Sequence, residues 1–335
     1  AENIIRISNN REQEETAAHV YMKVAVGDLP VFEKQFGVSN EEREHVIRVM
    51  AQSATEATGS MGDDTPIAVL SRQPRSLYDY FRQQFAQVTN PAIDPLRERS
   101  AMSLETLFGR EHNIFQEAST QAHRVVLPWP VLNVVKYRKL LELDKRWYGN
   151  QKFSLNYDQQ EDLQTALLRL CDDVSKAVAE DTVIVVLSDR DIAPGKLPIH
   201  AALATGAVHQ RLIRDGLRCD CNIVIETGTA RDPHHFAVLL GLGATAVYPY
   251  LAFQIINDLH ARGALKGDLL HHRKLYRRGV RKGLLKILSK MGISCVTSYR
   301  GAQLFEAVGL GSEITDLCCP GAAGNIGGAG FRRSE

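Results

Sequence analysis

The sequence has no stretch of about 20 uncharged apolar residues, the length that a membrane-spanning helix needs, so we expect no membrane span. An excess of one charge sign is also missing. The formal net charge is +1, which gives no broad field to attract nucleic acid or another polyanion. The 44% hydrophobic and 24% charged residues are typical of a water-soluble globular protein. We therefore expect neither a membrane nor a nucleic acid as a partner.

Cysteine is scarce, and its spacing matches no metal or redox motif. The absence of CxxC pairs excludes a zinc knuckle and a thioredoxin-type motif. No signal-like segment opens the chain, and the low cysteine count suits a reducing compartment, so we expect free thiols and a cytoplasmic location. The six cysteines are Cys171, Cys219, Cys221, Cys295, Cys318 and Cys319.

Motifs for nucleophilic catalysis and phosphate binding are lacking as well. The sequence contains no GxSxG and no cysteine beside a histidine. "GLGATA" (241–246) lacks the third glycine of a dinucleotide motif and precedes a strand, so a helix end is predicted there. "GNIGGAG" (324–330) has no helix after it, and we interpret it as a flexible exit from the domain. The sequence alone therefore predicts no catalytic, cofactor-binding or metal-binding residue.

Two adjacent histidines, His234 and His235, invite a metal or acid-base hypothesis. Adjacent side chains point about 100° apart on a helix, and HExxH spacing is absent, so one ion would hardly bind both. Asp232 and Pro233 come directly before them, and Asp-Pro is typical of a helix start with the aspartate as N-cap. We favour the helix start. His271 and His272, near Asp268, also lack ligand spacing.

Asp189 and Asp191 follow a predicted buried strand. In β/α folds that end of a strand faces the usual site, so both are candidates for chemistry on a small substrate. The alternative, which we favour, is that they only cap the turn.

What the sequence does contain is a regular alternation in its second half. Continuous β-branched runs at 182–188, 222–227, 244–249 and 293–298 predict buried strands. Helices are expected near 160–179, 199–216, 233–241, 250–262 and 272–290. This pattern predicts an α/β fold of parallel β/α units, a partial or modified (β/α) barrel.

In the first half of the chain we expect mainly helices. A capped helix is predicted from Ser39 or Asn40 over 39–57, a short strand over 67–70, and a helix over 76–88 that ends in a rigid proline-bearing loop, Thr89 to Arg97. A polar stretch at 150–162 suggests subdividing the single region 1–335 into a helix-rich part, 1–150, and a β/α part, 151–335.

A basic run, "HHRKLYRRGVRKGLLK" (271–286), is the one candidate for a charged partner surface. Leucines interrupt it at helical spacing, so we expect an amphipathic helix with a solvated or interdomain basic face, and give nucleic-acid binding less weight.

Long segments resemble one family. "GDDTPIAVLSRQPRSLYDYFRQQFAQVTNPAIDPLRERSAMSL" (62–104), "RLIRDGLRCDCNIVIETGTARDP" (211–233), "RDPHHFAVLLGLGATAVYPYLAF" (231–253) and "KGLLKILSKMGISCVTSYRGAQLFEAVGL" (282–310) are similar to the central domain of the large chain of bacterial glutamate synthase. The match runs in order along nearly the whole chain.

The resemblance implies a piece of a larger amidotransferase. In that family a glutaminase domain with an N-terminal cysteine releases ammonia, which passes through an internal tunnel. An FMN-bearing (β/α)8 synthase domain then condenses it with 2-oxoglutarate to form glutamate. A 3Fe-4S cluster belongs to the large chain, and a small subunit brings FAD and NADPH. Here residue 1 is Ala and clustered cysteines are missing, so no cofactor is expected on this chain, and the isolated chain is predicted to be inactive.

Within that family the central domain joins the two active sites, so residues at its turns are candidates for interdomain or tunnel contacts. Ammonia must stay unprotonated to attack a carbonyl, which requires packed, water-excluding walls. The candidates come from three turn segments. They are Asp63, Asp64, Asn90, Asp94, Arg97, Ser298, Tyr299 and Arg300.

Two alternatives stay open. The first is an independent α/β enzyme that uses Asp189, Asp191 or His234 in a deep polar pocket. The second is a self-associating binding module that exposes the basic helix around Arg277.

Overall fold

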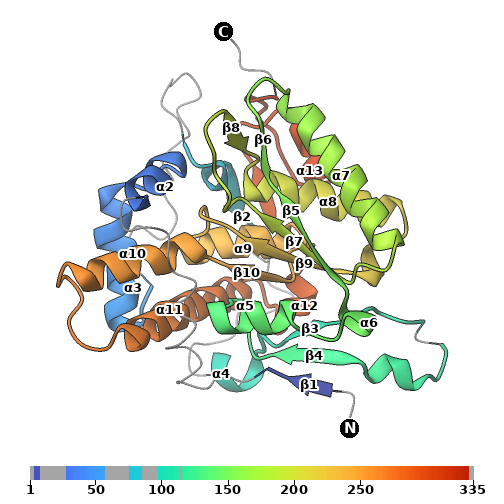
Figure 1. Ribbon diagram of the computed structural model, residues 1–335, viewed down its shortest axis with the longest axis horizontal. Coiled ribbons are helices and arrows are strands. Elements are labelled where there is room, and N and C mark those ends of the chain that lie inside the picture. The colour runs from blue at the N-terminus through green and yellow to red at the C-terminus, as the bar shows by residue number, and fades with distance from the viewer. Residues whose placement is uncertain (1–3, 8–27, 57–74, 85–96, 114, 332–335) are drawn as a thin grey trace.

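The computed structural model describes residues 4–7, 28–56, 75–84, 97–113 and 115–331. Its centre is a four-stranded parallel sheet in the order β10-β9-β7-β5 (Figure 1). The strands are β5 (Asn150–Ser154), β7 (Ile184–Ser188), β9 (Asn222–Glu226) and β10 (Ala246–Tyr248). This arrangement confirms the predicted α/β fold of parallel β/α units.

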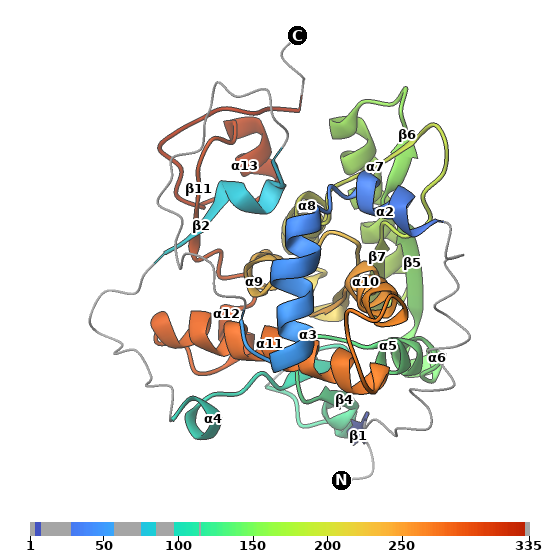
Figure 2. The ribbon, with the colours of Figure 1, turned by 90° about the vertical axis from the view of Figure 1, so that its left-hand side faces the viewer.

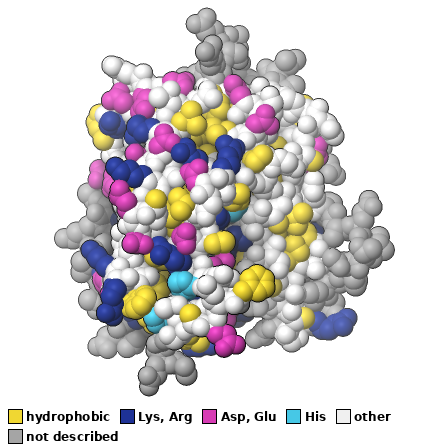
Figure 3. All heavy atoms as spheres, turned by 90° about the vertical axis from the view of Figure 1, so that its right-hand side faces the viewer, with side chains coloured by type: hydrophobic (Ala, Val, Ile, Leu, Met, Phe, Trp, Pro, Cys, Tyr) yellow, Lys and Arg dark blue, Asp and Glu magenta, His cyan; other side chains and the backbone are white. Residues whose placement is uncertain are grey.

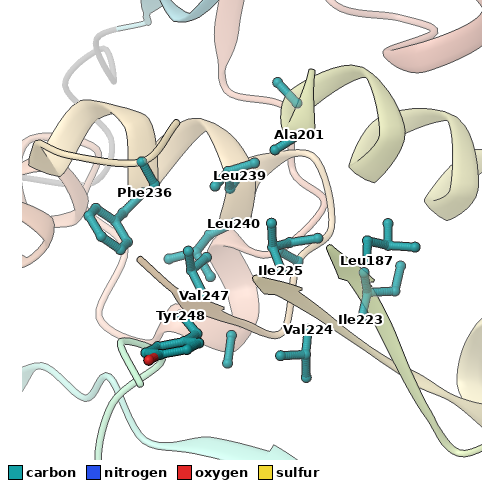
Figure 4. Close-up of a cluster of buried hydrophobic side chains, with 14 of the residues drawn as sticks. Leu187, Ala201, Ile223, Val224, Ile225, Phe236, Leu239, Leu240, Val247 and Tyr248 are labelled. Carbon is teal, nitrogen blue, oxygen red and sulfur yellow. The ribbon is translucent and has the colours of Figure 1, made fainter. Parts of the chain in front are cut away.

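Helices connect the strands and cover one face of the sheet. They are α7 (Leu163–Ala179), α8 (Ala201–Arg214) and α9 (Pro233–Gly241). Leu239 and Leu240 of α9 pack over Ile225 and Val247 of the sheet (Figure 4). β7, β9 and β10 are buried on both faces, as is typical of parallel sheets, which is why their sequences are continuously apolar. The positions of these three strands and of the helices agree with the predicted ones, whereas the polar strand β5 was not predicted.

The opposite face carries α5 (Val134–Leu141), whose Tyr137 ring stacks on Tyr248 with centroids 4.7 Å apart. Val131, just before α5, forms a parallel bridge to Val247 and so extends the sheet beyond β10.

Two long helices follow the sheet and receive the N-terminal part of the chain. α11 (Leu269–Lys290) follows α10 (Tyr250–Ala261) and lies under α3 (Arg48–Ser53), which continues η1 (Glu42–Ile47) and crosses α11 in Figure 2. Ser39 caps the crossing helix as predicted. Its Oγ accepts from Glu42 N at 3.1 Å, while Glu42 Oε2 accepts from Ser39 N at 3.0 Å.

Three smaller sheets surround this core. β1 (Ile4–Arg6), β4 (Arg124–Leu127) and β3 (Thr106–Phe108) form one; β2 (Phe81–Gln83) pairs antiparallel with β11 (Phe305–Ala307); and β6 (Asn156–Asp158) pairs with β8 (Lys196–Pro198). The remaining helices are short: α2 (Leu29–Gln35), η2 (Leu77–Tyr80), α4 (Glu98–Ala101), η3 (Ser119–Ala122), α6 (Lys145–Tyr148), η4 (Arg218–Asp220), α12 (Val296–Tyr299) and α13 (Ser312–Cys318).

Two predicted elements are wrong. The helix expected over 76–88 is, in its described part, the η2 turn followed by strand β2, because Phe81 is buried against Phe305 with ring centroids 5.0 Å apart. The strand expected over 293–298 is instead the short helix α12, preceded by a single bridge from Cys295 to Ser103. The strand predicted at 67–70 lies outside the described residues.

The glycine-rich run at 324–330 is also not the flexible exit that we expected. It lies along residues 307–311 and exchanges backbone hydrogen bonds with them, including Gly309 N to Ile326 O at 2.8 Å and Ala329 N to Gly309 O at 2.9 Å. Glycine is needed there because a Cβ at Gly328 would come within 2.4 Å of Gly309 O.

The basic helix is amphipathic with a solvated basic face, as predicted, since Lys274, Arg278, Arg281 and Lys282 are exposed. Arg273 and Arg277 of α11 are buried, and the guanidinium groups of Arg277 and Arg281 lie 4.9 and 5.2 Å from the ring centroid of Trp129. Arg277 is therefore not part of an exposed partner surface, and the binding-module alternative built around it loses its basis.

Elsewhere the surface mixes charges. On the face that carries α7 and α8, Lys and Arg side chains alternate with Asp and Glu (Figure 3), as in the pair between Arg211 and Asp172 at 2.6 Å. Among the helices of the described ranges, none is both long and apolar enough to cross a bilayer.

Candidate functional site

The carboxyl ends of β7, β9 and β10 bring a set of polar side chains to one edge of the sheet. In β/α folds this edge is where reactions take place, so it is the first place to look for chemistry. Buried groups from three strand ends meet there. They are Ser188, Asp189, Glu226, Thr227, Tyr248 and Tyr250.

Glu226 is the centre of the first cluster and is 1% exposed. Its Oε2 accepts hydrogen bonds from the Ser188 hydroxyl at 2.7 Å and the Tyr137 hydroxyl at 3.0 Å, while Arg190 Nη1 donates to Oε1 at 3.1 Å. Lys152 Nζ lies 3.3 Å from Oε2. Glu226 thus has four donors around it, two of which, Arg190 and Lys152, are cations. Its charge is balanced and its oxygens are fully hydrogen-bonded, which suits a structural role.

Asp189 is the centre of a second cluster and is 1% exposed. It accepts from Gly228 N at 2.9 Å and from the Thr227 hydroxyl. Burial, opposed by these hydrogen bonds, raises the pKa of Asp189 to about 7. The hydroxyl chain continues from Thr227 to Thr229 at 2.8 Å and from Thr229 to Tyr78 at 2.8 Å. The hydrogen-bond partners of the Asp189 carboxyl group are thus residues of the same chain.

The N-terminal part of the chain covers this edge. The Phe36 ring, just after α2, lies against Gly228, where a Cβ would approach Phe36 Cδ2 to 2.8 Å. Arg231, which is 3% exposed, holds the cover in place. Its Nε donates to Glu42 Oε1 at 2.8 Å and its Nη1 to Phe36 O at 3.2 Å. The Tyr276 hydroxyl in turn donates to Arg231 O at 2.8 Å.

The histidine pair belongs to the start of α9, which confirms the predicted helix start. Asp232 Oδ1 accepts from His235 N at 3.0 Å, and Pro233 is the first helical residue. The His235 ring stacks on Tyr78 with centroids 4.3 Å apart, and His234 Nε2 lies 3.0 Å from Tyr78 O. Burial lowers the pKa of His235 to about 4, so its ring is neutral at pH 7.

The structure does not unite the three residues of the independent-enzyme alternative in an open pocket. Asp189 lies buried under the cover, while the Asp191 side chain is 67% exposed and pairs with Lys152 at 3.1 Å. His234 is engaged with the backbone of Tyr78.

The eight candidates for interdomain contacts are placed in different ways. Four lie outside the described residues: Asp63, Asp64, Asn90 and Asp94. Arg97 is exposed in the turn before α4, and Ser298 is exposed on α12. Tyr299 faces the core, where its hydroxyl donates to Gln83 Oε1 at 3.0 Å.

Arg300 is the candidate with unused hydrogen-bonding capacity. Its Nε and Nη2 are buried without a hydrogen-bond partner in the part of the chain that the structure describes. Burial and the nearby Arg218 lower the pKa of Arg300 to about 10. Nε and Nη2 are the same two groups through which Arg169 holds both oxygens of Glu161, so this side of Arg300 fits a carboxylate.

The described residues contain no group of three or more His, Cys, Asp or Glu side chains able to hold a metal ion. All six cysteines are free. Burial raises the pKa of the thiols of Cys171, Cys221, Cys318 and Cys319, which keeps them protonated.

The sequence did not predict two sets of contacts: the Arg231 clamp, which is the pair of hydrogen bonds from Arg231 to Glu42 and Phe36, and the hydrogen-bond donors around Glu226. The partners are far apart in the chain, with 189 positions between Arg231 and Glu42 and 89 between Tyr137 and Glu226. Gly228 directly after a buried strand was the one local signal, since glycine there is typical of close approach by another group.

A model of the glutamate synthase central domain matches residues 32–311. Ferredoxin-dependent glutamate synthase 2, chloroplastic, from Arabidopsis thaliana is 43% identical over 310 residues, which cover 88% of this chain and 19% of that protein. Glutamate synthase [NADH] from Schizosaccharomyces pombe is 39% identical over 318 residues, covering 91% of this chain and 15% of the relative. The chain therefore spans about a fifth or less of the length of these relatives.

A solved structure, the recombinant flavin-binding domain of baker's yeast flavocytochrome b2, aligns with a TM-score of 0.33 and 17% identity, covering 41% of this chain and 32% of the other. A TM-score this low does not show a shared fold.

Proposed function

The chain belongs to the glutamate synthase central domain family, and from this premise we propose that it is the connecting domain of a glutamate synthase. In this role it links a glutaminase domain to an FMN-bearing synthase domain and helps to wall the route of ammonia between them. The parent enzyme then makes glutamate from glutamine and 2-oxoglutarate.

The observation that carries this proposal is the covered edge of the sheet. Phe36 lies on Gly228, and the Arg231 clamp fixes it over the strand ends where a β/α enzyme would bind its substrate. Glu226 and Asp189 are occupied by groups of the same chain. Because the usual substrate-binding edge is covered by the chain's own residues, this domain suits a structural role between two active sites.

The described part of this chain contains no group of three cysteines that would hold the parent's iron–sulfur cluster. The glycine run at 324–330 lies along residues 307–311 and pairs with them through backbone hydrogen bonds. The buried thiols are protonated and do not gather in threes. The proposal therefore assigns FMN and a 3Fe-4S cluster to other parts of the large chain, and FAD and NADPH to a small subunit. It places the enzyme in the cytoplasm, where free cysteines are stable.

A wall for ammonia must exclude water and offer few groups that protonate it. The tightly packed core around the sheet supports this role, since Ile225, Val247 and Leu240 are each 1% exposed or less. Arg300 supports a contact to a neighbouring domain, because its side chain is partly exposed and its Nε and Nη2 have no hydrogen-bond partner among the described residues.

The first experiment measures what the isolated chain lacks. The purified 335-residue protein is supplied with FMN, ammonia, 2-oxoglutarate and a reductant, and bound flavin and glutamate formation are measured. We expect no stoichiometric flavin and no turnover. Either one would overturn the proposal, because it would mean that this chain holds a site of its own.

The second experiment tests the linking role in the full-length glutamate synthase that contains this chain. Arg300→Gln is expected to raise the share of glutamine-derived ammonia that escapes into solution, at nearly unchanged glutaminase activity. Arg146→Gln is the control, since Arg146 is exposed, pairs with Asp144 at the surface and lies over the Trp147 ring. Equal ammonia escape from both variants would contradict an interdomain contact at Arg300.

A further inference from the structure

In the part of the chain that the structure describes, no further strand follows β5 in the parallel sheet. The sheet order is β10-β9-β7-β5, so among the described strands β5 has β7 as its one neighbour. Figure 2 shows β5 at the outer side of the sheet. The two residues in the middle of the strand, Gln151 and Lys152, are exposed.

Two backbone hydrogen bonds fix which backbone groups of β5 face outward. Gly149 O accepts from Ile184 N at 2.9 Å, and Leu155 N donates to Ser188 O at 2.7 Å. In a parallel pair, alternate residues of a strand bond to the same neighbour. The odd-numbered residues from 149 to 155 therefore face β7.

The even-numbered residues, Asn150, Lys152 and Ser154, consequently turn their N–H and C=O groups away from the sheet. Lys152 and Ser154 are exposed. A five-residue strand with three outward-facing residues is long enough to pair with a short extended segment.

A groove of about 240 Å³ runs beside this edge, between β5 and the first turns of α7. Asn156, just after β5, has its Oδ1 buried without a hydrogen-bond partner in the part of the chain described here. The groove is lined by the polar and charged residues Lys152, Ser154, Asn156, Tyr157, Arg169 and Asp173. Arg169 is paired with Glu161, and Lys152 with Glu226 and Asp191, within this chain.

We propose that an extended segment of the parent polypeptide, from outside residues 1–335, pairs with β5 as a further strand and fills this groove. The inference rests on the proposed function, since it needs the rest of a glutamate synthase. Relatives are about five times longer than the matched region, so the same polypeptide supplies ample further segments. Covalent linkage also gives such a segment a high effective concentration. Free strand edges promote aggregation, and a segment of the same polypeptide would protect this one.

The test compares amide hydrogen exchange in two proteins, the 335-residue chain and the full-length glutamate synthase. The Lys152 and Ser154 amides are expected to exchange at least tenfold more slowly in the full-length enzyme. Gln151 and Phe153 are built-in controls, because their amides face β7 and should be protected in both proteins.

Three results would overturn the inference. Equal, fast exchange of Lys152 and Ser154 in both proteins would mean that the edge stays open in the parent enzyme. Protection already present in dilute isolated chain would mean that this chain covers its own edge. Protection that grows with the concentration of isolated chain would identify a second copy as the occupant.

A pair of variants separates the backbone from the side chain. Lys152→Pro removes the outward amide, whereas Lys152→Ala keeps it; both lose the ion pairs to Asp191 and Glu226. The gap in unfolding temperature between the two variants should be larger in the full-length enzyme than in the isolated chain, and equal gaps would contradict strand pairing. Ammonia escape from the full-length enzyme, measured in parallel, reports on the proposed function separately from the exchange data.

Discussion

The ring of Phe36 rests on the backbone of Gly228, so close that any side chain there would collide with it. A Cβ at Gly228 would lie 2.8 Å from Phe36 Cδ2 and 2.9 Å from Cε2. Phe36 also meets the Tyr250 ring edge-on, with centroids 6.5 Å apart. The contact joins the N-terminal part of the chain to the loop after β9.

The first prediction concerns this contact. Gly228→Ala is expected to lower the free energy of unfolding by about 1–3 kcal/mol, because the added methyl group overpacks a closed site. Urea unfolding measures the change. The double variant Gly228→Ala with Phe36→Leu should lose less than the sum of the two single variants, since the smaller side chain leaves room. Simple additivity would contradict a direct clash.

Arg231 carries the second prediction. Arg231→Met removes the ion pair to Glu42 and leaves the buried carbonyl of Phe36 without its donor, so the free energy of unfolding should fall by about 2–4 kcal/mol. Arg146→Met is a matched control on an exposed ion pair and should change it by no more than about 0.5 kcal/mol. If the two variants lost equal stability, Arg231 would not be acting as a buried clamp.

The third prediction is a pH dependence that originates at Asp189. Burial raises the pKa of Asp189 to about 7, so between about pH 4 and pH 7 the folded chain keeps a proton that the unfolded chain has released. Stability from this group therefore falls as pH rises through that window, by up to about 4 kcal/mol.

Asp189→Asn isolates this effect. The variant keeps an acceptor for Gly228 N but cannot ionise, so it should gain stability relative to wild type as pH rises from 5 to 8. Chemical unfolding at several pH values measures the difference. His235, whose pKa is lowered to about 4, works in the opposite direction, but both proteins contain it. A difference that does not vary with pH would rule out a protonated Asp189.

The fourth prediction uses two neighbouring glycines near the end of the chain. A Cβ at Gly328 would approach Gly309 O to 2.4 Å, whereas one at Gly327 meets nothing within 4 Å. Gly328→Ala should loosen the strand-like segment and speed amide exchange at Ala329 and Gly311 about tenfold or more, while Gly327→Ala should leave both unchanged. Similar exchange in both variants would mean that the segment tolerates displacement.

Elements whose signals are local were predictable from the sequence. The start of α9 depends on Asp232 and Pro233, which are adjacent to the helix that they begin, and the strands β7 and β9 are marked by their own apolar residues. The order of β/α units follows from the spacing of such elements, so the fold class was also predictable.

Elements that depend on distant partners were not. Residues 81–83 lie in a stretch, 76–88, whose apolar spacing is typical of a helix. They form a strand because β11 supplies the hydrogen bonds and Phe305 supplies the packing surface. Val296 likewise donates its N–H to Ser103 O and begins a helix where apolar residues predicted a strand. The polar clusters around Glu226 and Arg231 could not be predicted from the sequence for the same reason, because no local spacing marks residues that meet across the fold.

The pairing of early with late residues also sets the order of events during synthesis. Gln83 accepts from Tyr299, 216 positions later, and Glu56 pairs with Lys286, 230 positions later. At about 5–20 residues per second a ribosome needs roughly 10–45 s to bridge such a gap. Until α10 and α11 emerge, η1 and α3, which carry Ile47 and Met50, lack the helices that they pack on. The N-terminal helices must therefore wait with apolar side chains uncovered, which makes the nascent chain a natural client for chaperones during that interval.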